Sequence, residues 1–192
     1  MTDGSVLLVE IERRTLSRVS PEGKISVVAD CGGGPNGAAI GPDGRVYVCN
    51  NGGFTWMQHG AFRRPGDALA PDYRGGSIQA VDLKTGAVQT LYTACNGETL
   101  NGPNDLVFDR HGGFYFTDLD KRRGRSIDRG SVFYARADGS AITEIVHPID
   151  TPNGIGLSAD ETTLYVAETS AARLWAFDIE SPGKLRPGPH PF

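Results

Sequence analysis

The sequence lacks the features of several protein classes. Its 192 residues contain only three cysteines, Cys31, Cys49 and Cys95, and no Cys-x-x-Cys pair. The chain therefore offers neither the thiol spacing of a structural zinc site nor that of a redox motif. We expect three buried thiols that behave as small hydrophobes.

Long apolar runs and a leader peptide are also missing. No stretch reaches the roughly 18 apolar residues that are needed to span a bilayer. Residues 1–4 are not followed by the basic segment and apolar run of a signal peptide. The sequence therefore predicts a soluble, cytoplasmic protein with no membrane partner.

Positive charge is scarce as well. The 19 basic and 23 acidic residues give a formal net charge of −4, and the densest basic cluster, residues 121–123, lies in a predicted loop. A surface that binds nucleic acid needs many Lys and Arg side chains on one face. No nucleic-acid partner is therefore predicted.

Glycine is what the chain has in excess. Its 26 glycines are about twice the usual share of about 7%, and they stand between short apolar runs. Three segments repeat one pattern, in which a Pro-Asn turn leads into a short apolar strand, a polar turn and a second strand rich in aromatic and β-branched residues. They are PNGAAIGPDGRVYVCN at 35–50, PNDLVFDRHGGFYFTD at 103–118 and PNGIGLSADETTLYVAE at 152–168.

These repeats predict the blades of an all-β propeller. A third strand follows each repeat, at 76–82, 130–135 and 172–178, and the first two units close with a fourth, at 87–92 and 141–146. Residues 6–10, 15–19 and 24–29 supply the end of an earlier unit. No segment keeps a helical period, and units whose Pro-Asn turns are 68 and 49 residues apart are typical of propellers.

We predict a single, partial propeller domain, 1–192, with about four blades. Residues 1–34 form the end of a first blade, 35–102 and 103–151 form the next two, and 152–192 form an incomplete blade. An insertion at 51–75 lengthens the second unit, and two interpretations of it stay open: a lid over a site, or a surface loop over a blade edge. Such an array leaves an unpaired edge, so we expect an incomplete ring that self-associates through it.

The Pro-Asn turns are the first candidates for a site. The innermost strands of a propeller surround its axis, so Asn36, Asn104 and Asn153 are expected at one mouth of the central channel. An amide oxygen is a hard donor that suits Ca²⁺ when a carboxylate lies nearby. The same residues also suit ordinary turns, because Asn tolerates a left-handed backbone. A cation site and plain turns therefore both stay open at this point.

The repeats resemble successive blades of the gluconolactonase, regucalcin (senescence marker protein) and luciferin-regenerating-enzyme-like family. The resemblance is carried by the runs GPNDLVFD with YFTD, TPNGIGLSAD with LYVAE, and PNGAAIGPDGRVYVCNNGG. The resemblance covers essentially the whole chain and implies a six-bladed propeller with one divalent cation on its axis. It implies that Asn153 is a metal ligand, Asn104 a metal ligand or substrate contact, and Asn36 part of the substrate pocket. Ca²⁺ is the expected cation, with Zn²⁺ and Mg²⁺ as alternatives.

The chain departs from the family pattern at both charged metal ligands. The resemblance places one acidic ligand in a Glu-Gly-Pro segment before the strand that starts at Val6, and an aspartate ligand in a Pro-Asp-Gly blade after Phe192. Neither segment is in the sequence, and four blades fall short of six. We therefore expect a truncated member of the family. Its asparagines alone would hold Ca²⁺ weakly, since affinity depends on the charge and number of the ligands.

The resemblance implies a metal-dependent hydrolase of a small, sugar-derived lactone. A bound cation would polarise the lactone carbonyl, and a carboxylate would act as general base on the attacking water. Asp105, Asp118 and Glu168 are the candidates for that base, and His59 in the insertion is a candidate substrate contact. Rival hypotheses are a noncatalytic propeller that binds a ligand or a protein, an inactive fragment without the acidic ligands, and a strictosidine synthase-like enzyme of different chemistry.

Overall fold

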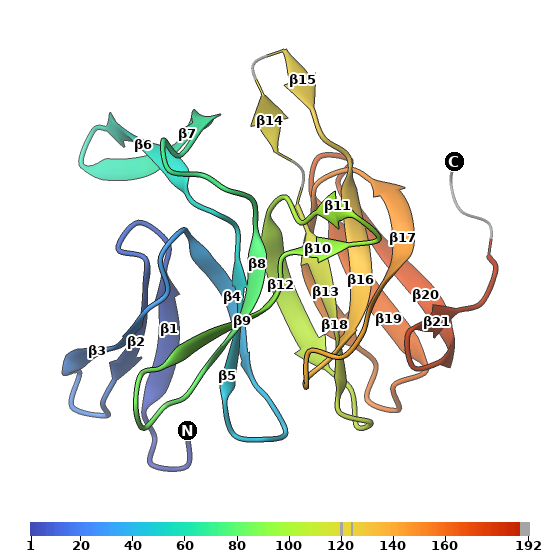
Figure 1. Cartoon of the computed structure of the whole chain (residues 1–192), viewed down its shortest axis with the longest axis horizontal. Coiled ribbons are helices and arrows are strands. Elements are labelled where there is room, and N and C mark those ends of the chain that lie inside the picture. Colours follow the sequence, from blue (N-terminus) through green and yellow to red (C-terminus); the bar gives the residue numbers. More distant parts are fainter. Residues whose placement is uncertain (120, 124, 189–192) are drawn as a thin grey trace.

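The computed structural model describes residues 1–119, 121–123 and 125–188 and consists of antiparallel sheets that stand side by side around a common axis (Figure 1). Within those residues the regular structure is all strand and turn, as the repeats predicted. No helix that could cross a membrane is present in them. The last residues of the predicted fourth segment, 189–192, lie outside the described residues.

Four sheets form the blades, and in each the strands follow one another outward from the axis in chain order. They consist of β1 (Val6–Glu10), β2 (Thr15–Val19) and β3 (Ile25–Asp30); β4 (Pro35–Ile40), β5 (Val46–Asn50), β8 (Ser77–Val81) and β9 (Val88–Tyr92); β12 (Pro103–Phe108), β13 (Gly113–Asp118), β16 (Gly130–Arg136) and β17 (Ile142–Ile149); and β18 (Pro152–Leu157), β19 (Thr163–Glu168), β20 (Arg173–Ser181) and β21 (Lys184–Leu185). The short β21 gives the last sheet a fourth strand, which the sequence did not predict.

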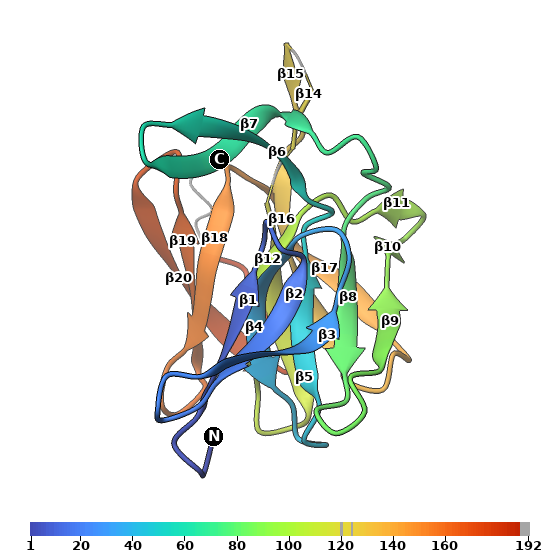
Figure 2. The ribbon, with the colours of Figure 1, turned by 90° about the vertical axis from the view of Figure 1, so that its left-hand side faces the viewer.

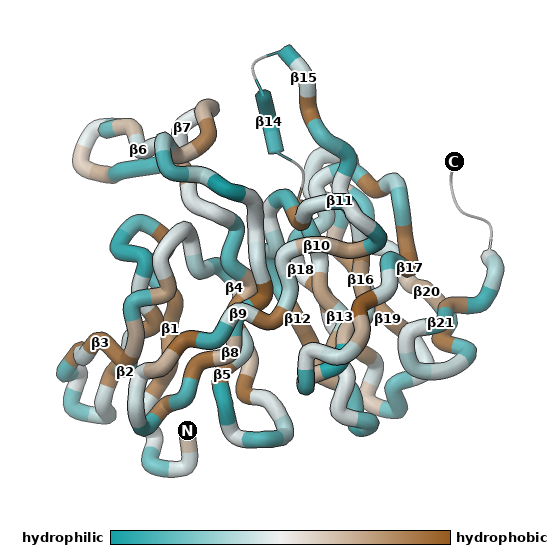
Figure 3. Tube along the Cα trace, viewed as in Figure 1, coloured by the Kyte–Doolittle hydropathy of each residue, from teal (hydrophilic) through white to brown (hydrophobic). Residues whose placement is uncertain are grey.

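The apolar side chains lie between neighbouring sheets. Figure 3 shows hydrophobic segments along the strands and hydrophilic ones at the turns. One cluster fills the space between the first two sheets, a second lies between the middle two, and a third lies between the last two. Tyr47 and Phe114 meet across the middle junction, with ring centroids 5.7 Å apart. The three cysteines are buried and free, as expected.

The sheets form an open arc. The inner strands β1, β4, β12 and β18 pack in that order, each against the next. In the described part of the chain no comparable packing joins β18 back to β1, and Figure 2 views the arc from its first sheet. The incomplete ring predicted from the sequence is therefore confirmed.

Short hairpins project from the end of the sheets where the inner strands begin (Figures 1 and 2). They are β6 (Phe54–His59) with β7 (Phe62–Leu69), β10 (Ala94–Cys95) with β11 (Glu98–Thr99), and β14 (Arg122–Arg123) with β15 (Ser126–Ile127). The first corrects the prediction of a loop at 51–75, because its residues pair in antiparallel register from Phe54↔Leu69 to His59↔Phe62, with one register shift between Phe54 and Trp56. Strand β7 packs against β14, so two hairpins stand together above this end.

Candidate functional site

Each of the inner strands β4, β12 and β18 begins with the Pro-Asn pair and carries a β-bulge directly after it. The register shifts lie between Pro35 and Ala38, between Pro103 and Leu106, and between Pro152 and Ile155. In each case two residues of the inner strand face one residue of the second strand, and such bulges commonly re-aim side chains. The three asparagines therefore occupy equivalent irregular positions at one end of the axis, as the repeats predicted.

Thr117 joins two of these bulges, and sequence reasoning missed it. The side chain is fully buried on β13, opposite the β12 bulge. Its hydroxyl donates to the Asn153 carbonyl at 2.6 Å and accepts from the Asp105 amide at 3.2 Å. One threonine thus fixes the starts of both β12 and β18, and with them two of the predicted site residues.

Asp105 lies between neighbouring inner strands. Its carboxylate accepts hydrogen bonds from its neighbour Leu106 N at 2.9 Å and from Ile155 N of β18 at 3.3 Å. On the other side is Gly37 of β4, where an added Cβ would come within 2.8 Å of Asp105 Oδ1. The glycine is required for this close approach, and it brings a carboxylate to the axis between β4 and β18.

The asparagines differ in exposure. Asn104 is 7% exposed, Asn36 is half-buried, and Asn153 is exposed at the surface of the mouth. The bulges and Thr117 bring Asn104, Asp105 and Asn153 together at adjoining strand starts. Asn36 belongs to the same end through the packing of β4 against β12.

The other two carboxylates stand one strand further out, at positions that repeat from sheet to sheet. Asn50, Asp118 and Glu168 end the second strands and pair with the prolines that open the inner strands. All three are buried and accept a backbone N–H from the linker that leads into their own sheet. Glu168 accepts from Asp150 N and from the Trp175 indole, both at 2.9 Å. These groups anchor the linkers, and their role as a general base stays a prediction.

Asp118 is electrostatically distinct from an ordinary surface acid. Burial raises its pKa to about 7, although hydrogen bonds from Gly102 N and Asn101 N and the charge of Lys121 act in the opposite direction. Its side chain lines a cavity of about 430 Å³ that Ser131 and His147 also line. Its ionisation therefore falls near neutral pH, at the wall of a cavity.

The insertion supplies part of the mouth, but His59 does not lie there. Phe54 and Leu69, paired at the base of the β6–β7 hairpin, line a cavity of about 210 Å³ together with Lys121 and Thr151. His59 sits at the opposite, turn end of that hairpin and is exposed. The structure thus places the β6–β7 hairpin over the end of the sheets where the inner strands begin. The substrate contact proposed for His59 stays a prediction.

The donor atoms at the mouth suit a hard cation in kind. Asp105, Asn104 and Asn153 supply a carboxylate and amide oxygens and no nitrogen or sulfur ligand, which fits Ca²⁺ better than Zn²⁺. A full Ca²⁺ shell has about six to eight oxygens, so these residues would make up only part of it. Among the described residues no cluster of three His, Cys, Asp or Glu side chains is arranged to hold a metal.

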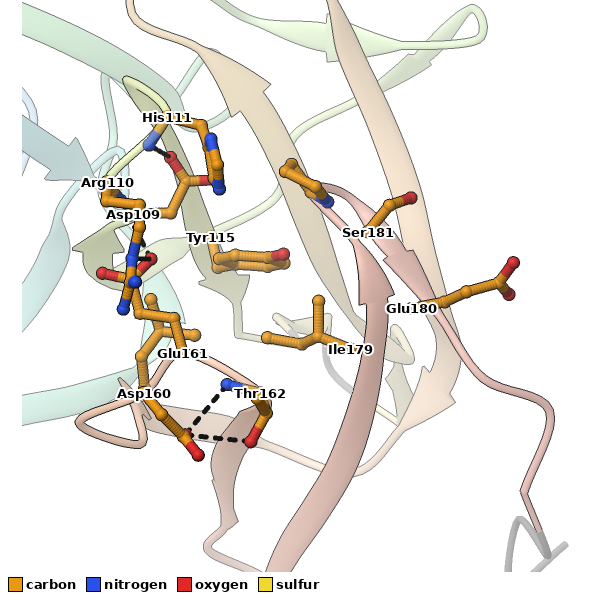
Figure 4. Close-up of a pocket in the computed structure, with 12 residues that line it drawn as sticks. Asp109, Arg110, His111, Tyr115, Asp160, Glu161, Thr162, Ile179, Glu180 and Ser181 are labelled. Carbon is orange, nitrogen blue, oxygen red and sulfur yellow. Dashed lines mark hydrogen bonds and ion pairs between the residues drawn. The ribbon is translucent and has the colours of Figure 1, made fainter.

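A third cavity, of about 240 Å³, lies at the opposite ends of the strands (Figure 4). Its acids already serve local structure. Asp109 accepts from His111 N at 2.8 Å, Asp160 from Thr162 N at 3.1 Å, and Glu161 from Arg110 N at 3.0 Å. We interpret this cavity as a junction between the last two sheets, away from the Pro-Asn starts.

Comparison with known proteins agrees with this architecture. A lactonase drp35 of Staphylococcus aureus (strain bovine RF122 / ET3-1) is 35% identical over 189 residues, which cover 94% of this chain and 49% of that protein. A gluconolactonase structure from Xanthomonas campestris superposes with a TM-score of 0.73 at 24% identity, covering 97% of this chain and 58% of that chain. A calcium-binding regucalcin from Agrobacterium tumefaciens superposes with a TM-score of 0.66 at 18% identity, covering 93% and 51%.

The chain thus spans about half the length of the curated relatives it matches. The match to the family is nevertheless continuous along it, since the SMP-30/gluconolactonase/LRE-like region aligns with residues 1–191. Together with the repeated Pro-Asn strand starts and the open propeller arc, this alignment shows that the chain belongs to the SMP-30/gluconolactonase/LRE-like family.

Proposed function

We propose that this chain carries part of the active-site mouth of a metal-dependent hydrolase that opens a small, sugar-derived lactone. The observation that carries the proposal is the Asp105 carboxylate, which is held between inner strands at the strand start that carries Asn104 and adjoins the start that carries Asn153. Buried Thr117 and the close approach of Gly37 leave this arrangement little freedom. Such rigid support is what a binding or catalytic constellation requires.

The proposed roles follow from position. Asn104 and Asn153 would hold a divalent cation, Ca²⁺ first, and Asp105 supplies the negative charge that two amides lack. When bound, the cation would polarise the lactone carbonyl and acidify the attacking water. Asn36 and Asn104 orient the sugar hydroxyls, and Asp105 is the carboxylate best placed to accept the proton of the water.

The rival proposal is a noncatalytic propeller that binds a ligand or a protein partner. It is favoured by the lack, in the described ranges, of a cluster of three or more His, Cys, Asp or Glu side chains arranged around a metal. On that hypothesis the asparagines serve as turns, and Asp105 serves only as a link between β12 and β18.

Calcium calorimetry separates the two proposals. The hydrolase proposal expects saturable Ca²⁺ binding by the wild-type chain, loss of that binding in Asn104→Ala/Asn153→Ala, and Ca²⁺-dependent acid release from gluconolactone. Asp105→Asn should weaken both binding and hydrolysis, whereas the matched surface control Asp178→Asn should change neither. A folded chain that neither binds Ca²⁺ nor opens the lactone would leave the scaffold as the better description.

A further inference from the structure

Lys121 is a buried ammonium that has no hydrogen-bond partner among the residues that the structure describes. The residue is 3% exposed, and within the described chain no hydrogen-bond acceptor reaches its Nζ atom. Nζ lies 4.1 Å from the centre of the Phe54 ring and 5.4 Å from that of Tyr73. Both rings belong to the 51–75 insertion. Cation–π contacts of this kind offset only part of the desolvation of a charged group.

The charged groups around Lys121 do not satisfy it. Asp118 is its acidic neighbour in the described structure, yet the oxygens of Asp118 already accept from Asn101 N and Gly102 N. Arg123 is a like charge that stacks on Tyr73 and pairs with Asp128 at 2.9 Å. Burial therefore lowers the pKa of Lys121 to about 8, although Asp118 opposes the shift. The group remains mostly charged at neutral pH, and none of the described carboxylates forms a hydrogen bond or an ion pair with it.

The position of Lys121 connects it to the mouth. An added Cβ on Gly102 would lie 2.9 Å from Lys121 Cε, so the lysine stem rests on the linker that enters Pro103-Asn104. Lys121 also lines the cavity of about 210 Å³ beneath the β6–β7 hairpin, together with Thr151 and Ser170 of the last sheet. The cavity thus extends from the lysine toward the segment that precedes Asn153.

Thr151 marks the far side of this cavity with a strained backbone. Its φ is +44°, which is rare for a β-branched residue, and Pro152-Asn153 follows directly. Strain of this kind persists where the surrounding structure enforces it, and it gathers at binding and active sites. The cavity is therefore flanked by an unsatisfied cation on one side and a strained site-bearing turn on the other.

We propose that Lys121 anchors a carboxylate-binding subsite next to the propeller mouth, with the Phe54 ring as its movable cover. The inference deepens the proposed lactonase function and rests on it for the kind of ligand. Hydrolysis breaks the acyl carbon–ring oxygen bond and joins the water oxygen to the acyl carbon. The product is a hydroxy acid that gives up a proton and carries a carboxylate. The same subsite would equally take a carboxylate that an acidic lactone carries from the start.

The dimensions suit such a group. A cavity of about 210 Å³ is smaller than the roughly 300–1,000 Å³ of typical sites for drug-sized ligands, so it fits one end of a small acid. An ammonium and a carboxylate form a charge-assisted hydrogen bond, which is among the stronger polar contacts in proteins. Rotation of Phe54 would expose Nζ, while Tyr73 is tied in place by its hydroxyl, which donates to Asn101 O at 2.7 Å.

Binding of gluconate, measured by calorimetry at pH 7, tests the proposal. Sorbitol is the neutral partner of similar length, and a glucaric acid monolactone represents a carboxylate carried by the substrate. Wild-type chain should bind gluconate but not sorbitol, and Lys121→Met should weaken binding about tenfold or more. The surface control Lys84→Met should bind as wild type does. If Lys121→Met weakens binding of the monolactone alone, the subsite takes the carboxylate of an acidic substrate. If it weakens binding of gluconate, the subsite takes the carboxylate of the product.

Two further measurements keep the outcome decisive. Titrations in EDTA separate this subsite from the metal site. Gluconate binding that disappears without Ca²⁺ but survives Lys121→Met would overturn the proposal and leave the lactonase function intact. If Lys121→Met fails to fold, acetylation of the wild-type chain at pH 8 replaces it. Gluconate should then protect Lys121 and leave Lys84 unprotected, and equal labelling with and without gluconate would refute the subsite.

Discussion

Replacing Thr117 by valine should loosen the mouth of the propeller at a predictable cost. Valine keeps the shape of the fully buried side chain and removes the hydroxyl that serves Asp105 N and Asn153 O. A buried polar group left without its partner costs about 1–3 kcal/mol. Because Asp105 N has Thr117 as its acceptor and the Asn153 contact is short, we expect the free energy of unfolding to fall by about 2–3 kcal/mol.

Thr117→Ser provides the matched control. It keeps both hydrogen bonds and deletes a single buried methyl group, which should cost about 1 kcal/mol. Urea unfolding followed by tryptophan fluorescence measures both variants, and with a slope of about 1–3 kcal/mol/M the valine midpoint should fall by about 1 M. Amide exchange at Asp105 should also accelerate in Thr117→Val and stay slow in Thr117→Ser. A valine variant as stable as the serine variant would refute the role assigned to the hydroxyl.

The remaining predictions concern the axis and the buried acid. Gly37→Ala should destabilise the fold by about 1–3 kcal/mol in a thermal unfolding assay, because the added Cβ would lie 2.7 Å from Asp105 Cα. The control Gly156→Ala should cost far less in that assay, because no atom lies within 4 Å of its added Cβ. The folded-state pKa of Asp118, about 7, lies above its usual 3.8, so its contribution to stability is full below about pH 4 and is lost as pH rises through about 7. Between pH 4 and 8 the free energy of unfolding of the wild type should therefore fall by up to about 4 kcal/mol relative to Asp118→Asn, and parallel pH profiles would contradict this.

The blades could be predicted because their cause is local. Alternating apolar residues, polar turns and the repeated Pro-Asn start are visible in short windows of sequence. They predicted the strand order of the sheets that begin with β4 and β12 and of the first three strands of the sheet that begins with β18. The insertion was not predicted to be a hairpin because its pairing depends on the turn between His59 and Phe62, while β7 carries proline and glycine, which are depleted from strands. A few paired residues such as β21 have no periodicity to detect.

The site could be predicted only in part, for the same physical reason. The asparagines were found because they repeat, but Thr117 acts on Asn153 across 36 residues of chain and has no counterpart at the equivalent positions Cys49 and Ala167. Lys121 looked like part of a solvated basic cluster, because its burial is caused by the Phe54 and Tyr73 rings from a distant insertion. The residue spacing within one blade does not predict contacts between blades.

The residues that end the second strands, Asn50, Asp118 and Glu168, differ in chemistry, yet each of them anchors the linker into its own sheet. Asn50 accepts from Gly34 N and also donates to the carbonyls of Cys31 and Gly32, at 3.1 and 3.0 Å. An amide suits a linker that presents both donors and acceptors. In the described structure Asp118 and Glu168 accept hydrogen bonds from N–H donors, which suits acceptor-only carboxylates. The polarity of each linker therefore accounts for its acid or amide, and the raised pKa of Asp118 follows from this structural duty before any catalytic one is invoked.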